Sequence, residues 1–259
     1  MSQCEKLRKD LESKSIVKVC GAYDSMSAKL VELYGFDAVW AGSFAISAIH
    51  NVPDASILTM TEFFTAASNM AHACEIPVIA DCDTGYGDAT NVRYMVKKYE
   101  SAGIAGICIE DKTFPKQYSL LEGGSNQLLS EKDFAAKILA ANETKQNKAF
   151  TIIARIEALI SGMGIEQALK RSYAYEKAGA DLILIHSKKI TPEEIFEFSD
   201  SWKGNTPLVV IPTTYYSVNV DDLIEHKIKM VIYANQTLRA AHFALSKLLK
   251  QMKGANNMK

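Results

Sequence analysis

Apolar and polar residues along this chain form two alternating patterns. Short apolar runs of strand length recur eight times, and each is followed by a longer stretch whose apolar residues return at helical spacing. We expect strands at residues 16–20, 37–41, 77–81, 104–109, 151–155, 182–186, 207–211 and 229–233. We expect helices at 25–34, 61–74, 90–102, 131–144, 164–178, 192–202, 219–226 and 236–252. This alternation predicts parallel strands joined by right-handed crossovers.

Residues at the expected helix ends support this division. Ser130 and Thr191 precede acidic first turns, as capping residues do at helix starts. Gly103 and Gly179 stand directly before strands, where a left-handed residue commonly ends a helix. Eight strand–helix units imply a closed (β/α)8 TIM barrel, a fold of about 250 residues. We therefore predict an α/β protein with a single barrel domain over residues 1–259.

One connection is longer than the others. Residues 112–129 contain two adjacent glycines, Gly123 and Gly124, and show no regular helical or strand period. Long connections in compact domains are commonly lids over a functional site. We therefore predict a mobile lid loop at residues 112–129.

Composition narrows the class of protein. The chain has 259 residues, of which 48% are hydrophobic and 23% are charged, enough for a sizeable core. The net charge of −1 gives no electrostatic reason to expect a nucleic acid or an anionic membrane as partner. Apolar runs stay well short of the ~18 residues of a membrane span. Residues 1–14 lack the apolar core of a signal peptide. We expect neither a nucleic-acid nor a membrane partner.

The five cysteines indicate a reducing compartment. They are odd in number, scattered, and form no Cys-x-x-Cys pair, which argues against a zinc site. We therefore predict a cytoplasmic protein. Cys82 lies between two acids, but side-chain alternation along a strand turns it to the opposite face. We do not expect it to be a nucleophile.

Carboxylates gather where the expected strands end. Asp81 and Asp83 share one face of the third strand's end, because side chains alternate with period two. Glu110 follows the fourth apolar run, and Asp54 lies in the loop before the third strand. Active sites of this fold lie at the carboxyl ends of the strands. Mg2+ prefers oxygen ligands and often takes only one or two carboxylates directly. The sequence therefore offers Asp81, Asp83 and Glu110 as metal ligands.

Other polar residues stand at the same expected edge. Arg155 ends the fifth strand, and its planar guanidinium suits a carboxylate or a phosphate. His186 ends the sixth strand and can donate a hydrogen bond to a substrate oxygen. Asp111 and Glu157 are compatible with a site role and equally with a structural salt bridge at the barrel rim.

The second strand ends in a run of small residues. Trp40 and Ala41 lead into Gly42, Ser43 and Phe44. Small residues let backbone N–H groups approach an anion, so this run suits a phosphoryl cradle. A plain tight turn explains the same residues.

Four segments together resemble the phosphoenolpyruvate mutase and isocitrate lyase superfamily. They are residues 81–87, 110–116, 154–158 and 186–189, in this order. The form Glu-Asp-Lys at 110–112, without the Lys-Xaa-Cys-Gly-His lid of the lyases, is similar to the phosphonate branch. That branch contains the mutase and phosphonopyruvate hydrolase. The resemblance covers nearly the whole chain and implies a TIM barrel of this superfamily's type.

The resemblance implies a role for each candidate residue. Asp83 would be the closest Mg2+ ligand, while Asp81, Glu110 and Asp54 would act through water. Asp54 is also a candidate catalytic residue. Arg155 and His186 would hold the substrate's anionic groups, and Lys116 would close over it from the lid. The expected substrate-contacting residues are Trp40, Gly42, Ser43, Phe44, Tyr118, Ser119 and Ser187.

The activity implied by the resemblance is the Mg2+-dependent interconversion of phosphoenolpyruvate and phosphonopyruvate. Phosphonopyruvate hydrolysis to pyruvate and phosphate is the main alternative. A C–C lyase of a substituted malate is disfavoured because no cysteine lies between Glu110 and Arg155. A non-catalytic oxo-acid binder is a fourth possibility.

The lid departs from the family pattern. Mutases of this kind have Asn-Ser where this chain has Tyr118-Ser119, and the hydrolase typically has a small hydroxyl residue at the Tyr118 position. The resemblance also implies a homo-oligomer, either a dimer or a tetramer.

Overall fold

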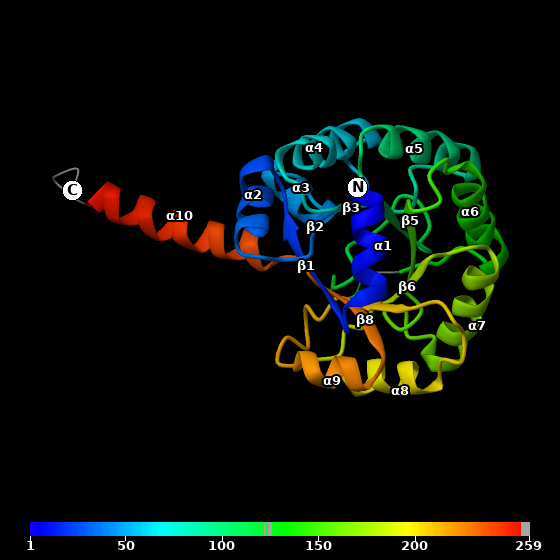
Figure 1. Ribbon diagram of the computed structural model, residues 1–259. Coiled ribbons are helices and arrows are strands. Elements are labelled where there is room, and N and C mark those ends of the chain that lie inside the picture. The colour runs from blue at the N-terminus through cyan, green and yellow to red at the C-terminus, as the bar shows by residue number, and fades with distance from the viewer. Residues whose placement is uncertain (122, 124–125, 255–259) are drawn as a thin grey trace.

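Eight parallel strands close into a barrel, as the alternating patterns predict. The computed structural model describes residues 1–121, 123 and 126–254. Each strand pairs with the next in sequence, and β8 pairs with β1, so the sheet closes on itself (Figure 1). The strands are β1 (Val17–Ala22), β2 (Ala38–Ala41), β3 (Val78–Asp81), β4 (Gly106–Glu110), β5 (Thr151–Ile156), β6 (Leu182–Ile185), β7 (Leu208–Val210) and β8 (Ile228–Tyr233). The predicted TIM barrel is confirmed. The predicted domain limits include residues 255–259, which lie outside the described part.

Helices surround the barrel at the predicted places. Those expected from the sequence are α2 (Ser25–Leu33), α4 (Met60–Ala73), α5 (Ala89–Ser101), α6 (Glu131–Thr144), α7 (Gly164–Lys177), α8 (Glu193–Ser201), α9 (Val220–Glu225) and α10 (Gln236–Gly254). Two further helices were not expected, α1 (Gln3–Ser13) and α3 (Ser43–Ile49). α1 begins at a capping box, in which Ser2 and Glu5 bond each other's backbone N–H groups. Both lie outside the strand–helix repeat, so the repeat gave no signal for them.

The strands carry two apolar layers, one on each face of the sheet. Trp40 and Leu184 belong to the layer inside the barrel, whereas their neighbours Val39 and Ile183 belong to the layer under the helices. Consecutive side chains of a strand point to opposite faces, so every strand contributes to both layers. Burial on both faces explains why the strands read as continuous apolar runs rather than as alternating ones.

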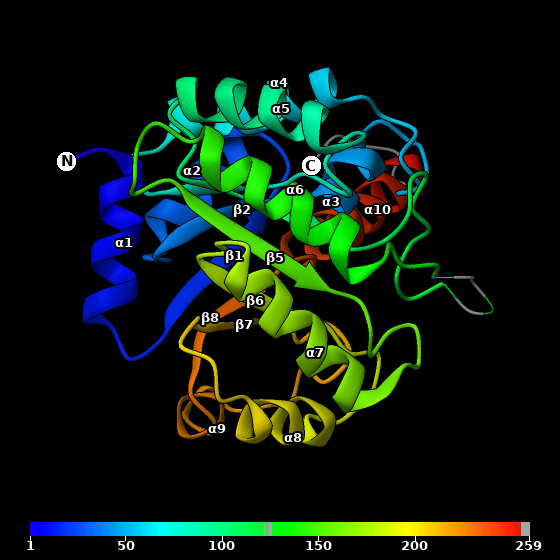
Figure 2. The same cartoon turned by 90° about the vertical axis from the view of Figure 1, so that its right-hand side faces the viewer.

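α1 seals the barrel at the amino ends of the strands. Leu7 and Leu11 are buried in the same apolar cluster as the inward-facing strand residues. Arg8 of α1 donates to the Ala149 carbonyl (Nε to O, 3.1 Å) and pairs with Asp181 (Nη2 to Oδ1, 2.6 Å). Figure 2 shows α1 at the end opposite the loops that follow the strand arrowheads. The carboxyl ends are therefore left as the end on which a site can form.

The predicted lid connects β4 to α6 at the carboxyl ends of the strands. An isolated antiparallel bridge between Lys112 and Leu128 joins its two ends. Lys116 and Ser119 of the lid are buried, so the first half of the lid is folded over the strand ends. Positions 122, 124 and 125 lie outside the described residues, and the mobility of the lid stays a prediction.

α10 extends away from the barrel (Figure 1). None of its described side chains is buried, although five of the exposed ones are large and apolar: Phe243, Leu245, Leu248, Leu249 and Met252. Leu245, Leu248, Leu249 and Met252 recur at helical spacing and form one apolar stripe. Among the described residues, no helix has both the length and the apolar character that crossing a membrane requires.

We predict that Leu7→Ala destabilises the barrel, because it removes a fully buried side chain from the inner apolar layer. The free energy of unfolding should fall by about 2–5 kcal/mol. Urea unfolding followed by circular dichroism measures it. The matched control, Leu33→Ala on the exposed face of α2, should change it by less than about 0.5 kcal/mol. Equal effects of both substitutions would show that α1 does not seal the barrel.

Candidate active site

Charged side chains from four adjacent strands meet at the carboxyl edge of the barrel. Asp81 ends β3 and Glu110 ends β4, while Arg155 lies directly opposite Glu110 in β5. His186 follows β6. The register pairs Asp81 with Cys108, two residues before Glu110, and Arg155 with Leu184, two residues before His186, so all four positions lie near the same edge. All four are buried, and charged side chains are rarely buried unless they are paired.

The turn after β3 is shaped to present Asp83. Asp83 and Tyr86 have positive φ angles of 49° and 59°, which cost energy for residues with a side chain. The Glu110 amide donates to the Asp83 carbonyl (2.8 Å) and ties the turn to β4. The buried ammonium of Lys137 in α6 donates to the Thr84 carbonyl (2.8 Å). These bonds hold the Asp83 carboxylate at the strand end.

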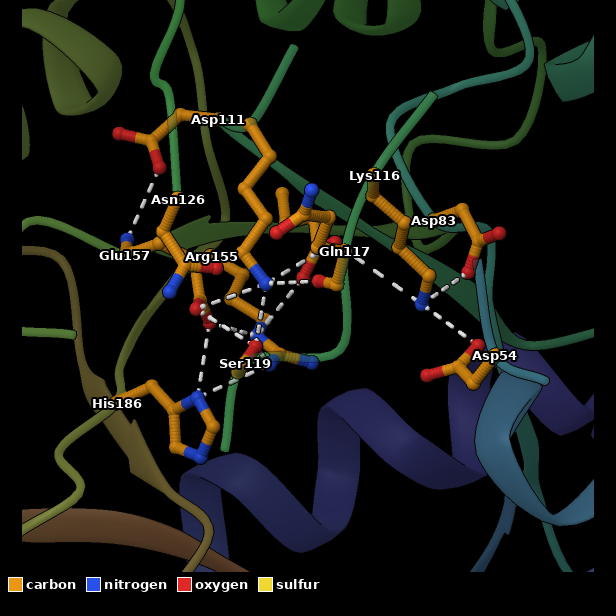
Figure 3. Close-up of polar contacts among 12 residues, drawn as sticks. Asp54, Asp83, Asp111, Lys116, Gln117, Ser119, Asn126, Arg155, Glu157 and His186 are labelled. Carbon is orange, nitrogen blue, oxygen red and sulfur yellow. Dashed lines mark hydrogen bonds and ion pairs between the residues drawn. The ribbon is translucent and has the colours of Figure 1, made fainter. Parts of the chain in front are cut away.

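Lys116 of the lid reaches into a group of four carboxylates, here called the acidic cluster: Asp54, Asp81, Asp83 and Glu110. Its Nζ lies 2.6 Å from Asp83 Oδ1 and 2.9 Å from Asp54 Oδ1. Glu110 Oε1 is 4.0 Å away. Figure 3 shows the ammonium between the Asp54 and Asp83 side chains. The lid lysine thus offsets part of the negative charge of the cluster.

Burial disfavours the charged forms of Asp81 and Asp83, two of the four carboxylates of the acidic cluster. It raises the pKa of Asp83 to about 7, which Lys116 opposes and the Asp54 and Asp81 carboxylates reinforce. Burial also raises the pKa of Asp81. For Lys116, burial acts to lower the pKa, but the surrounding carboxylates hold it well above its usual value. An additional cation at this place would be stabilised by the same field.

A second group, here called the Arg155 cluster, lies beside the first: Lys112, Ser119, Arg155, Glu157 and His186. Glu157 Oε1 accepts from Arg155 Nε (2.5 Å) and lies 2.9 Å from His186 Nδ1. Arg155 Nη2 also lies 3.0 Å from His186 Nδ1, so this nitrogen donates to Glu157 or accepts from Arg155 according to its tautomer. Figure 3 shows the imidazole turned toward these groups. Glu157 therefore has a place in the site and contacts both Arg155 and His186.

Ser119 joins the lid to the Arg155 cluster. Its hydroxyl donates to Glu157 Oε2 (2.8 Å) and accepts from Arg155 Nη2 (3.0 Å) and from Lys112 Nζ (2.5 Å). Lys112 Nζ also donates to the Gln117 carbonyl (2.9 Å) within the lid. The Ser119 hydroxyl thus donates its one hydrogen bond and accepts two within the protein.

Opposing effects set the charges of this cluster. Burial lowers the pKa of His186, although Glu157 acts in the other direction, so the ring is neutral near pH 7. Burial acts to raise the pKa of Glu157, but Arg155 and its other cationic neighbours hold it well below the usual value. Arg155 and Glu157 are therefore a permanent ion pair at neutral pH.

Asp111 faces away from both clusters. Its carboxylate pairs with Arg171 of α7 (Oδ2 to Nη1, 2.8 Å) and accepts from the Tyr175 hydroxyl (2.8 Å) and the Glu157 amide (2.9 Å). Arg171 Nη2 in turn donates to the Leu129 carbonyl at the end of the lid (3.0 Å). Asp111 was compatible with a role in the site or with a structural salt bridge at the barrel rim, and the structure shows the salt bridge.

A cavity of about 40 Å3 lies between the two clusters and holds room for about three water molecules. Most of the expected site residues line it: Trp40, Gly42, Ser43, Phe44, Asp54, Asp81, Lys116, Tyr118, Ser119, Arg155 and His186. Asp83 and Glu110 stand behind Lys116. Sequence reasoning missed Leu120, Ile211, Thr213, Ala234 and Asn235. Ile211 and Thr213 follow β7, and Ala234 and Asn235 follow β8, so their place at strand ends could have identified them. They carry no charge, and the search for charged residues therefore passed over them.

The small residues after β2 begin helix α3. Gly42 is its N-cap residue, and a Cβ at this position would lie 3.0 Å from the Trp40 ring. Ser43 donates to Asp81 Oδ2 through its hydroxyl (2.9 Å) and its amide (3.3 Å). Lys116 Nζ donates to the Ser43 hydroxyl (3.1 Å). These groups face the cavity, and their function as a phosphoryl cradle stays a prediction.

Two residues of the site motifs point elsewhere. The Ser187 hydroxyl donates to Glu194 of α8, and Ser187 does not line the cavity. The substrate contact of Ser187 stays a prediction, and the loop after β6 turns this side chain toward α8 in the present structure. Cys82 is buried in the layer under the helices, and burial raises its thiol pKa well above the usual value. It faces away from the acids, as side-chain alternation predicts.

The acidic cluster offers the carboxylate oxygens that Mg2+ prefers, but these oxygens are not arranged around a common point, and Lys116 lies among them. Within the described residues, no three potential ligands are gathered closely enough to hold a metal ion. Three buried oxygens, Asp54 Oδ1, Asp83 Oδ1 and Glu110 Oε1, nevertheless have no hydrogen-bond donor in suitable geometry. Carboxylate oxygens are the ligands that Mg2+ prefers. The residues therefore fit the ion once the lysine moves aside.

Comparisons with known proteins agree with this site. A family model for phosphoenolpyruvate phosphomutase matches residues 7–253. The chain belongs to the phosphoenolpyruvate phosphomutase family. Phosphonopyruvate hydrolase of Variovorax sp. (strain Pal2) is 42% identical over 254 residues, which cover 98% of this chain and 88% of the relative.

Solved structures of the phosphoenolpyruvate phosphomutase family have the same barrel. Phosphoenolpyruvate phosphomutase from Streptomyces platensis subsp. rosaceus gives a TM-score of 0.95 at 43% identity, covering 97% of this chain and 87% of that one. Phosphonopyruvate hydrolase in complex with oxalate and Mg2+ gives 0.92 at 41% identity, covering 98% and 87%. The resemblance drawn from the four sequence segments is therefore confirmed.

We predict that Asp111→Ala acts on stability rather than on chemistry. It would leave Arg171 buried without its ion partner, and the free energy of unfolding should fall by about 3–5 kcal/mol. Urea unfolding measures the change, and Asp221→Ala on the exposed side of α9 is the control. Unchanged stability together with lost turnover would instead place Asp111 in the reaction.

Proposed function

We propose that this protein is a Mg2+-dependent enzyme that interconverts phosphoenolpyruvate and phosphonopyruvate. The observation that carries the proposal is a small cavity between a buried acidic cluster and the Arg155 cluster, with the lid folded over it. In the forward direction, the phosphorus–carbon bond at C3 of phosphonopyruvate breaks. The phosphoryl group then forms a bond with the oxygen of the pyruvate enolate.

The acidic cluster would hold the metal ion. Asp81, Asp83 and Glu110 are the proposed ligands, with Asp54 acting through water or on the substrate. Bound Mg2+ would neutralise charge that develops on the substrate oxygens. The crowding of the cluster supports this assignment, because Asp54 and Asp83 share the one ammonium of Lys116 and burial raises the pKa of Asp81 and Asp83.

The Arg155 cluster would hold the substrate's anionic groups. Glu157 engages Arg155 mainly through Nε, so the guanidinium is oriented while its Nη edge stays near the cavity. The neutral His186 would donate a hydrogen bond to the phosphoryl group. Phosphoryl transfer proceeds through a loose transition state and depends mostly on positioning and charge stabilisation. Fixed, buried donors supply both.

The lid would keep the reaction dry. Water would capture a loosely bound phosphoryl group, and a closed site excludes that water. Lys116 of the lid occupies the centre of the acidic cluster, so binding of the metal ion there requires this part of the lid to move. Lys116 would then exchange its contacts with the acidic cluster for contacts with the anionic groups of the substrate.

Phosphonopyruvate hydrolysis is the second candidate. It is supported by the 42% identity to the Variovorax hydrolase, close to the 43% identity to the Streptomyces phosphomutase. It would use the same metal and anion contacts, and water would take the place of the enolate oxygen as acceptor. A C–C lyase or a non-catalytic oxo-acid binder would leave phosphonopyruvate unchanged.

Phosphorus NMR of the protein with Mg2+ and phosphonopyruvate tests the proposal. We expect the phosphonate signal to be replaced by that of phosphoenolpyruvate, and a chelator should abolish the change. Asp83→Asn and Arg155→Lys should each lower turnover by at least about 100-fold, because the first removes the charge of a proposed metal ligand and the second replaces the planar guanidinium that would hold an anionic group. Asp221→Asn on α9 is the control. Inorganic phosphate alone would establish the hydrolase, and an unchanged spectrum would reject both.

We also propose that the protein forms a homo-oligomer, a dimer or a tetramer, through α10. The helix carries five large apolar side chains that the barrel of the same chain does not cover. Exposed apolar patches of this kind commonly mark protein interfaces. A net charge of −1 offers little repulsion between copies.

Leu248→Asp tests the oligomer, because it places a charge in the middle of the apolar stripe of α10. Sedimentation velocity should show a species of lower mass than the wild type. Lys247→Asp, one position away, is the matched control and should leave the mass unchanged. A wild type that sediments as a monomer would contradict the proposal.

The five free, buried cysteines support a proposed location in the cytoplasm, where thiols stay reduced.

A further inference from the structure

Two aromatic rings from different parts of the chain meet at the cavity. Tyr118 of the lid lies against Phe44 of α3, with ring centroids 5.1 Å apart and an angle of 30° between the ring planes. Both residues line the cavity. α3 and the lid are far apart in sequence, so this contact exists because the lid is folded over the strand ends.

We infer that Tyr118 and Phe44 form a specificity wall that limits the size of the substrate's carbon chain. The charged groups of a ligand have the acidic cluster and the Arg155 cluster as partners. A carbon group added to the ligand carries no charge, and besides Gly42, Ser43, Ser119, Thr213 and Asn235 the uncharged lining of the cavity offers it apolar neighbours. Those neighbours are Trp40, Phe44, Tyr118, Leu120, Ile211 and Ala234.

Tyr118 is the aromatic part of this lining that the lid brings in. Trp40 is buried inside the barrel and Phe44 is placed by α3, so both are fixed by regular structure. With the ring of Tyr118 in place, the cavity is about 40 Å3. Additional carbon atoms on the ligand would have to displace the ring from Phe44 or stop the lid from closing.

The ring rather than the hydroxyl forms the wall. Burial raises the pKa of the Tyr118 hydroxyl, although Arg239 of α10 opposes this, so the side chain is neutral near pH 7. Tyr118→Phe keeps the ring and should keep the wall. Tyr118→Ala removes the ring and should open the cavity. A role of the hydroxyl in binding would reverse this order.

The test compares two ligands that differ only in bulk. Oxamate resembles pyruvate in shape and charge, and N-ethyloxamate adds two carbons to the same group. Titration calorimetry with Mg2+ present measures both dissociation constants. The inference rests on the proposed function for the class of ligand, a 2-oxo acid, but the measurement does not require turnover.

We expect the wild type to bind oxamate at least about tenfold more tightly than N-ethyloxamate, because each excess methylene in a tight pocket costs about tenfold or more. Tyr118→Phe should keep this ratio, and Tyr118→Ala should reduce it about tenfold or abolish it. Tyr216→Ala, an exposed tyrosine after β7, is the matched control and should keep the ratio.

Equal ratios in the wild type and Tyr118→Ala would overturn the inference, as would equal losses in Tyr118→Phe and Tyr118→Ala. Failure of the wild type to bind oxamate would overturn it as well. The proposed function fails separately. If the ratio behaves as expected but phosphorus NMR shows no loss of phosphonopyruvate, the wall stands and the proposed reaction does not.

Discussion

Compensation of buried charge is the constraint on which the carboxyl end of this barrel depends. Carboxylates that leave water lose solvation, and only cations or hydrogen-bond donors within reach offset that loss. The Arg155 cluster meets this demand internally, since Glu157 is shared by Arg155, Lys112 and the Ser119 hydroxyl. The acidic cluster meets it only in part, because Arg155 and Lys112 lie near Glu110 but Asp54 and Asp83 share the Lys116 ammonium, and burial raises the pKa of Asp81 and Asp83. This imbalance makes the acidic cluster the place for an added cation.

The lid couples the two clusters because its contacts lie close together in sequence. Lys116 reaches the acidic cluster, and Ser119 reaches the Arg155 cluster. Tyr118, between them, turns to the cavity and meets Phe44. Moving this segment therefore changes the charge balance of one cluster, the hydrogen bonds of the other and the volume between them. The predicted movement of the lid would therefore act on both clusters at once.

The rest of the barrel holds this site in place. α1 seals the opposite end, and the inner apolar layer fixes the strands in register. The pairing of Asp111 with Arg171 anchors both the end of β5 and the end of the lid, through the Glu157 amide and the Leu129 carbonyl. α10 contributes little to this packing, because its side chains are uncovered. Its apolar stripe is better explained by contacts beyond a single barrel.

The sequence by itself determined the barrel, because eight strand–helix units have periods that local residues set. It also determined which acids stand at the carboxyl edge, since Asp81 and Glu110 end their strands, whereas the turn with positive φ at Asp83 decided where that side chain lies. Only the tertiary structure decided which of the polar residues near the strand ends face the site and which face away from it. It turned Asp111 outward to Arg171 and Glu157 inward to Arg155, and it directed Ser187 to Glu194. It also placed Lys116 among the acids and Tyr118 on Phe44. These outcomes depend on partners distant in sequence, which no local pattern specifies.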